Sequence, residues 1–226
     1  MSKNFITNNF TEIKKLLIKF PKTKICVVSK TQSAEKISEV ISSGAKIIGE
    51  NRVEEFSEKQ NKIKFCSKVK KHFIGHLQSR KTKQAVEIFD LIESVDSEKL
   101  ARKISQEAKK INKKIKIFLQ VNIFSDPNKF GFSTEKIFHV CKNISQLENL
   151  EVCGLMTIGK LSTNEKETKI GFLNLKKLFE EIKKRKIFGK NFLEISMGMS
   201  NDFLIAAKCG STIVRIGRRI FEETKS

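Results

Sequence analysis

The sequence predicts a single (β/α)8 barrel, a TIM barrel, with an N-terminal helix, formed by residues 1–226 as one domain. Short apolar runs alternate with amphipathic helical segments eight times, as buried parallel strands covered by helices do. The chain of 226 residues is close to the length of about 250 that such barrels have. No Pro/Gly/Ser-rich linker divides it. A doubly wound open sheet is the alternative, disfavoured because no GxGxxG motif follows the first apolar run.

The predicted elements follow one another in a regular order. Residues 5–20 carry an apolar stripe of helical period that stops at Pro21. The strand-like runs then cover residues 24–29, 45–49, 72–75, 89–95, 115–123, 150–158, 192–196 and 211–217. Helical segments follow these runs from Ser33, from about residue 51 into the sixties, near 79–88, from Ser97, around 137–144, around 172–182 and from about Ser200. Residues 218–223 are expected to form a final turn.

Composition and charge restrict the class of protein. Apolar residues make up 39% of the chain and charged residues 31%, which is ordinary for a soluble domain with a sizeable core. No apolar run approaches the roughly 20 residues of a membrane span, and the start MSKNFITNNF lacks the layout of a secretory signal. We therefore expect a cytoplasmic protein without a membrane partner. The net charge is +20, but the basic residues are spread along the whole chain, so a specific nucleic-acid surface is disfavoured.

The five cysteines are odd in number, widely spaced and without a CxxC motif. Three of them lie in apolar segments. We therefore expect reduced core thiols rather than disulfides or zinc ligands. The five cysteines are Cys26, Cys66, Cys141, Cys153 and Cys209, of which Cys26, Cys141 and Cys153 lie in apolar segments.

The first candidate site residue is Lys30, at the end of the apolar run KICVVSK. A buried strand seldom ends on an ammonium group without a reason, because desolvating that charge is costly. Lysine also forms an imine (Schiff base) with an aldehyde cofactor. The structural alternative is a lysine that extends its charged end to water.

The ends of the other predicted strands supply further candidates, because barrel active sites lie at the carboxyl ends of the strands. Phosphate groups often bind there at the loops after strands seven and eight. Met199 and Ser200 are expected to open the helix before Phe203, where the Ser200 hydroxyl would donate to a phosphate oxygen, and Gly217 would let the backbone approach a ligand. The structural alternatives are a helix N-cap at Ser200 and a plain turn at Gly217. The remaining candidates at strand ends are Glu50, Asn51, Arg52, His76, Gln78 and Ser196.

Arg215 lies within the last apolar run, where an arginine either pairs with a carboxylate or faces a ligand. With a pyridine cofactor it would donate to the ring nitrogen and keep that nitrogen unprotonated. Asn51 would hold the ring hydroxyl or flank the imine. His72 and His76 are spaced i, i+4 but in a strand and without the HExxH glutamate, so a metal site is disfavoured. No residue is assigned a catalytic role.

Five motifs together resemble one family, the pyridoxal phosphate homeostasis proteins (YggS/PROSC-like): VSKTQ (28–32), IGENRVEE (48–55), HFIGHLQSRK (72–81), GLMTI (154–158) and SMGMSNDFLIAAKCGSTIVRIG (196–217). The resemblance implies the barrel of the alanine racemase N-terminal domain. It implies that pyridoxal 5′-phosphate (PLP) is held as an imine on Lys30, with Ser200 and Gly217 at the phosphate, Arg215 at the ring nitrogen and Asn51 lining the pocket.

The same resemblance implies a role in cofactor homeostasis without established catalytic turnover. Apo forms of PLP-dependent enzymes would then be the recipients, and a monomer is expected because no assembly motif is evident. Two positions depart from the family pattern, since Arg52 replaces an aromatic residue and His76 replaces a proline of many members.

The alternative function is a PLP-dependent amino-acid racemase. Racemisation needs an acid/base group on each face of the bound substrate. In alanine racemase, which the chain resembles, a tyrosine supplies the second face, and this chain contains no tyrosine. Cys, His or Lys could replace it, but the sequence marks none of them out. A cofactor carrier is therefore preferred.

Overall fold

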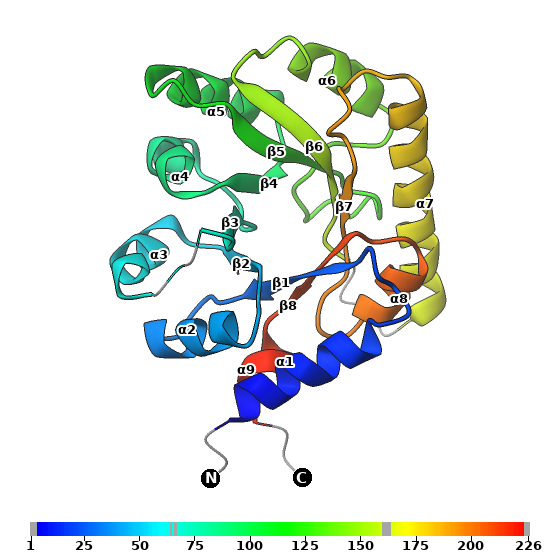
Figure 1. Ribbon diagram of the computed structural model, residues 1–226. Helices are drawn as coiled ribbons and strands as arrows, with labels where there is room; N and C mark the ends of the chain where they lie inside the picture. The colour runs from blue at the N-terminus through cyan, green and yellow to red at the C-terminus, as the bar shows by residue number, and fades with distance from the viewer. Residues whose placement is uncertain (1–3, 64, 66, 160–163, 224–226) are drawn as a thin grey trace.

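The computed structural model describes residues 4–63, 65, 67–159 and 164–223 and has the predicted barrel architecture. Eight parallel strands form a closed barrel in sequence order, with helices packed around the outside (Figure 1). The prediction of a (β/α)8 fold is confirmed. The strands are β1 (Lys24–Val28), β2 (Ile47–Glu50), β3 (Lys70–Phe73), β4 (Leu91–Val95), β5 (Ile115–Gln120), β6 (Leu150–Met156), β7 (Glu194–Ser196) and β8 (Ile213–Ile216).

The strand register aligns the ends of neighbouring strands. Val28 of β1 pairs with Gly49 of β2, and the barrel closes where Cys26 of β1 pairs with Arg215 of β8. Side chains alternate between the two faces of each strand. Cys26 and Arg215 therefore lie side by side on the inward face, and residues after the strands line the carboxyl rim.

The helices largely follow the prediction. They are α1 (Phe5–Leu16), α2 (Ala34–Ser42), α3 (Val53–Lys59), α4 (Thr82–Ile88), α5 (Glu98–Lys110), α6 (Ile137–Ile144), α7 (Glu165–Lys184), α8 (Phe203–Lys208) and α9 (Arg218–Phe221). Ser33 and Ser97 cap α2 and α5, because their hydroxyl oxygens accept backbone N–H groups of the first turn.

Two helix boundaries were predicted wrongly. Helix α1 ends at Leu16 and does not extend to residue 20. Helix α8 begins at Phe203 with Asp202 at its N-cap, so Ser200 lies in the preceding turn and is not the cap. The physical reason is a closed turn before the helix, in which the N–H of Met199 donates to the Asp202 carboxylate at 2.6 Å.

The apolar core has two parts. The larger one fills the layer between strands and helices. The smaller one fills the barrel interior and consists of Cys26, Ile47, Leu91, Phe118, Cys153, Met156 and Ile213. Cys26, Cys141, Cys153 and Cys209 are free and buried, as predicted, whereas Cys66 lies outside the described residues.

Helix α1 packs against α9, and the two ends of the described chain lie close together (Figure 1). The side-chain amide of Asn9 donates to the carbonyl oxygens of Ile220 and Glu222, at 3.2 and 3.1 Å. These contacts fasten the N-terminal helix to the segment that follows β8. Among the described residues, no helix is both long enough and apolar enough to cross a bilayer.

Candidate functional site

All five residues predicted to bind the cofactor lie on or beyond the carboxyl halves of the barrel strands. Lys30 follows β1 by two residues, Asn51 follows β2 directly and Gly217 follows β8 directly. Ser200 lies in the turn between β7 and α8. Continuing the register of β1 and β2 by two residues places Lys30 level with Asn51. The structure thus brings together at one end of the barrel the residues that the sequence singled out.

Arg215 reaches from β8 across the barrel interior, where its side chain is only 4% exposed. Its guanidinium donates to the Ser196 hydroxyl at 2.7 Å and to the Thr157 carbonyl oxygen at 2.7 Å. Ser196 ends β7 and Thr157 follows β6, so the guanidinium lies at the level at which these strands end. Two hydrogen bonds from a planar group fix its orientation, and its remaining N–H groups stay available for a ligand.

A buried carboxylate lies beside the guanidinium. Glu93 of β4 is 4.0 Å from Arg215, and its two oxygens are hydrogen-bonded to the Ser196 hydroxyl and to His72 Nδ1, at 2.5 and 2.7 Å. Burial alone would raise the pKa of Glu93. The hydrogen bond and charge of His72, the charge of Arg215 and the Ser196 hydrogen bond outweigh burial, so the pKa lies below its usual value.

These partners fix the direction of every proton in the chain of hydrogen bonds. An ionised carboxylate only accepts and a guanidinium only donates, so the Ser196 hydroxyl accepts from Arg215 and donates to Glu93. His72 must then donate through Nδ1 to Glu93. We call Arg215, Ser196, Glu93 and His72 the floor network, because all four belong to barrel strands and not to the loops that follow them.

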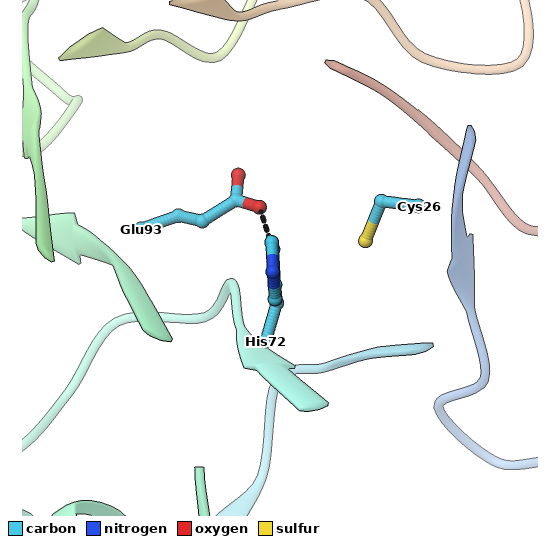
Figure 2. A group of neighbouring side chains, drawn as sticks. All are labelled: Cys26, His72 and Glu93. Carbon is cyan, nitrogen blue, oxygen red and sulfur yellow. Dashed lines mark hydrogen bonds and ion pairs between the residues drawn. The ribbon is translucent and has the colours of Figure 1, made fainter. Parts of the chain in front are cut away.

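Figure 2 shows Glu93, His72 and Cys26 pointing toward one another inside the barrel. Their potential ligand atoms lie within 4.8 Å of one another, which would suit a metal ion. However, both Glu93 oxygens are already hydrogen-bonded, and the cationic Arg215 is adjacent. Burial, together with the charge of Glu93, raises the pKa of the Cys26 thiol well above its usual value, so the thiol is protonated. We therefore assign the group to the floor network and not to a metal site.

The two histidines that the sequence placed near each other are separated by the fold. His72 points into the barrel, whereas the side chain of His76 is 42% exposed and outside it. His76 Nδ1 is 3.0 Å from the Asp96 carboxylate, and its ring stacks on Phe130. The i, i+4 spacing therefore does not form a shared ligand site.

The rim at β7 and β8 is shaped by close backbone packing. The carbonyl of Gly198, a residue with φ of +93°, accepts the N–H of Arg215 at 2.9 Å. A Cβ at Gly217 would lie 3.0 Å from the carbonyl oxygen of Val28. Glycine at 217 therefore allows β8 to approach the end of β1 closely, beside Lys30. Ser200 is mostly buried in the neighbouring turn.

Asp202 places a carboxyl group next to that turn. Burial raises its pKa, opposed by the Met199 N–H and the charge of Arg215. An anionic group bound at the turn would therefore meet a carboxyl group as well as hydrogen-bond donors. Nothing in the sequence indicated that a carboxyl group would lie beside this turn, because Asp202 looks like an ordinary helix N-cap.

Asn51 carries an observation that points to a ligand. Its Oδ1 is buried and has no hydrogen-bond partner among the described residues. Buried polar atoms are nearly always bonded, so an unbonded one at a rim is a place for a ligand group or a water molecule. Gly75 of the next strand end packs so closely on Asn51 that a Cβ there would lie 2.4 Å from its backbone oxygen. The backbone that carries this amide is thus tightly packed.

The other strand-end candidates have different surroundings. Glu50 is fully buried and faces the helix layer, where the Ser29 hydroxyl donates to it at 2.6 Å. Arg52, His76 and Gln78 line a separate surface pocket of about 270 Å³ that Asn51 also borders. They do not join the floor network.

The residues present fit PLP in their donor set. An exposed lysine amine, a fixed guanidinium in the barrel interior, an unbonded amide oxygen and a tight turn next to a glycine lie at one end of the barrel. An aldehyde, a pyridine nitrogen, a ring hydroxyl and a phosphate group would each find a partner of suitable chemistry there.

Comparisons with known proteins agree with this fold. The family model described as alanine racemase, N-terminal domain, matches residues 2–224. A pyridoxal phosphate homeostasis protein of Aquifex aeolicus is 36% identical over 202 residues, which cover 89% of this chain and 87% of that protein. The human protein of the same name is 36% identical over 209 residues, covering 88% and 76%.

Solved structures extend the comparison. PipY of Synechococcus elongatus PCC7942, solved with PLP bound, matches with a TM-score of 0.87 at 30% identity and covers 96% of this chain and 99% of PipY. An alanine racemase of Clostridium difficile 630 matches with a TM-score of 0.81 at 16% identity, over 99% of this chain and 58% of the racemase, which shows a shared fold alone. From its sequence and its fold, the chain belongs to the family of pyridoxal phosphate homeostasis proteins, built on the alanine racemase N-terminal barrel.

Proposed function

We propose that this protein binds PLP as an imine on Lys30 and takes part in intracellular PLP homeostasis, storing and delivering the cofactor without catalytic turnover. The relatives named as homeostasis proteins and the PLP-bound PipY structure support this function. The observation that carries it is the Arg215 guanidinium, fixed by two hydrogen bonds at the rim level of the barrel interior. Glu93, 4.0 Å away, balances the charge of this arginine, and we propose that the N–H groups not engaged by Ser196 and Thr157 bind the cofactor.

The proposed roles follow from the chemistry of each group. PLP supplies an aldehyde that condenses with the Lys30 amine, with loss of water. Arg215 donates to the ring nitrogen and, being always charged, leaves that nitrogen unprotonated, so the ring withdraws electrons weakly. Asn51 holds the ring hydroxyl or flanks the imine. The Ser200 hydroxyl donates to a phosphate oxygen, and Gly217 lets the backbone approach the phosphate group closely.

A weak electron sink suits a carrier better than a catalyst, because carbanion chemistry at the cofactor would be poorly stabilised. The racemase alternative also needs a second acid/base group, and the chain has no tyrosine to supply one. We propose that apo forms of PLP-dependent enzymes receive the cofactor, and that the protein acts as a cytoplasmic monomer.

The direct test is the visible imine absorption of the purified protein after incubation with PLP, followed by borohydride reduction and peptide mapping. Wild-type protein should carry the reduced adduct on Lys30, and Lys30→Ala should lose the absorption. Lys36→Ala, which changes an exposed lysine of α2, is the matched control and should behave as wild type. An adduct scattered over surface lysines would refute the site.

Two further measurements test the cofactor-binding roles of Arg215 and Ser200 and the alternative function as a racemase. Arg215→Gln and Ser200→Ala should each raise the dissociation constant of PLP, and an unchanged constant would remove that residue from the site. Solvent deuterium appearing at the α-carbon of an added amino acid at a useful rate would establish turnover and contradict the carrier function.

A further inference from the structure

The residue after Lys30 has a strained backbone. Thr31 has a φ of +63°, in the left-handed region that β-branched residues rarely adopt. Its conformation therefore costs folding free energy and persists only where the surrounding contacts hold it. Thr31 directly follows Lys30, so whatever holds this turn also fixes the direction in which the Lys30 side chain leaves the strand.

The contacts that hold the turn come from Lys59, the last residue of α3. Its ammonium group donates to the carbonyl oxygens of Ser29 and Gln32, at 3.0 and 3.3 Å. These two residues flank Lys30 and Thr31 in the chain. One charged side chain, only 12% exposed, thus binds the backbone on both sides of the strained turn.

Two carboxylates complete the arrangement around this ammonium group. Glu50 lies 2.8 Å and Glu55 2.9 Å from Lys59 Nζ. Each carboxylate also contacts the turn, because Glu50 accepts from the Ser29 hydroxyl and Glu55 accepts the Thr31 N–H, both at 2.6 Å. We call Lys59, Glu50 and Glu55 the turn clamp. Every member bonds both to another member and to residues 29–32.

The clamp is unusual for a purely structural ion pair. Burying charges is costly, and a lysine with two carboxylates buries more charge than a neutral contact would need. Burial raises the pKa of Glu50 despite its hydrogen bonds from Lys59 and Ser29, so the cost of desolvating this carboxyl group is not fully offset by its partners. All of these bonds converge on the four residues that contain the proposed imine lysine.

We infer that Lys59, through the turn clamp, is a positioning residue that holds the strained turn and thereby aims the Lys30 amine at the cofactor aldehyde. This inference rests on the proposed function of Lys30. Lys59 does not touch the cofactor in this proposal. It acts by keeping residues 29–32 in the one conformation from which Lys30 condenses with PLP.

The experiment compares Lys59→Met with Lys62→Met, a control at an exposed lysine three residues further on. The readouts are the equilibrium constant of imine formation with PLP and the fraction of Lys30 labelled by borohydride at limiting PLP. Loss of charged hydrogen bonds of this kind is worth about 10- to 100-fold in an equilibrium constant. The equilibrium constant of imine formation should fall by that factor in Lys59→Met, whereas in Lys62→Met it should stay within about twofold of the wild-type value.

A second variant separates positioning from stability. Removing Lys59 alone leaves buried Glu50 without its cation, so the single variant is expected to be less stable. Glu50→Gln combined with Lys59→Met removes that charge and should restore much of the thermal stability. If Lys59 positions the turn, the imine constant of the double variant stays low. If the imine constant recovers with stability, Lys59 is merely structural and the inference fails.

A third variant tests the strained turn itself. Thr31→Asn places at position 31 a residue that tolerates positive φ, and it should raise the imine constant in the Lys59→Met background. No gain would show that the strain is not what the clamp opposes, and would overturn the inference. Wild-type protein without a Lys30 adduct would refute the proposed function, and this inference with it. A normal wild-type adduct with equal labelling in Lys59→Met refutes this inference alone.

Discussion

Replacing Glu93 by Gln should destabilise the protein by about 3 to 5 kcal/mol, because it removes the carboxylate that is paired with the buried Arg215. The carboxylate is 4.0 Å from the guanidinium. At that separation and an effective dielectric constant of about 20, the attraction is worth about 4 kcal/mol. Glutamine keeps the size of the side chain but turns an acceptor of two hydrogen bonds into a group that both donates and accepts.

The assay is urea unfolding with the slope of the transition monitored, so that a change in midpoint can be read as a change in stability. Glu180→Gln is the control. Glu180 pairs with Lys176 at 2.6 Å one turn away on α7, and its side chain is 52% exposed. Exposed pairs of this kind contribute about 0.3 to 0.5 kcal/mol.

A double-mutant cycle with Arg215→Met assigns the loss to the charge pair. If the pair is responsible, Glu93→Gln should cost much less in the Arg215→Met background than in the wild type. A loss below about 1 kcal/mol for Glu93→Gln alone, at an unchanged slope, would refute the charge argument. Equal losses in both backgrounds would assign the effect to the hydrogen bonds of Ser196 and His72.

Three more outcomes are expected. Because the folded-state pKa of Glu93 lies below its usual value, its carboxylate stabilises the fold above about pH 4.3 and stops doing so as the pH falls through the lower folded value. The stability gap between wild type and Glu93→Gln, measured by denaturation at several pH values, should therefore close in acid. Gly75→Ala should cost about 1 to 3 kcal/mol in thermal unfolding, because its Cβ would lie 2.4 Å from the Asn51 oxygen, whereas Gly189→Ala, with nothing within 4 Å, should be tolerated. Asp202→Asn should lower the dissociation constant of PLP in an absorbance titration, because it removes a carboxyl group beside the proposed phosphate turn; weaker binding would contradict that placement.

The barrel could be predicted from the sequence because its signals are local. Apolar runs of strand length and amphipathic helical periods recur eight times, and each predicted run overlaps an observed strand. Lys30, Asn51 and Gly217 could be found in the same way, since their place follows directly from the ends of predicted strands. The start of α8 could not be predicted from the sequence, because it depends on a turn that is closed by the side chain of Asp202.

The parts of the site that were missed depend on contacts between distant segments. In the sequence, Lys59 looks like an exposed helix-end lysine, and only the contact of its ammonium group with Ser29, 30 residues earlier in the chain, points to the positioning role that we infer. Glu93 did give a signal, a carboxylate inside the apolar run FDLIESV, but its partner Ser196 is 103 residues away. Pairings of this range depend on the closed barrel and are not visible in periodicity.

The contact between α1 and α9 has a consequence for how the chain reaches its native state. The amide of Asn9 is bonded to carbonyl groups 211 and 213 residues later, so this contact closes a loop of nearly the whole chain. A ribosome that makes the chain from its N-terminus would release α1 long before β8 and α9 exist. The part of α1 that packs against α9 would stay uncovered during most of translation, whereas its contacts with α2, such as the hydrogen bond between Thr7 and Ser43, can form early. Burial of α1 is therefore completed only after β8 and α9 have been made, late in synthesis.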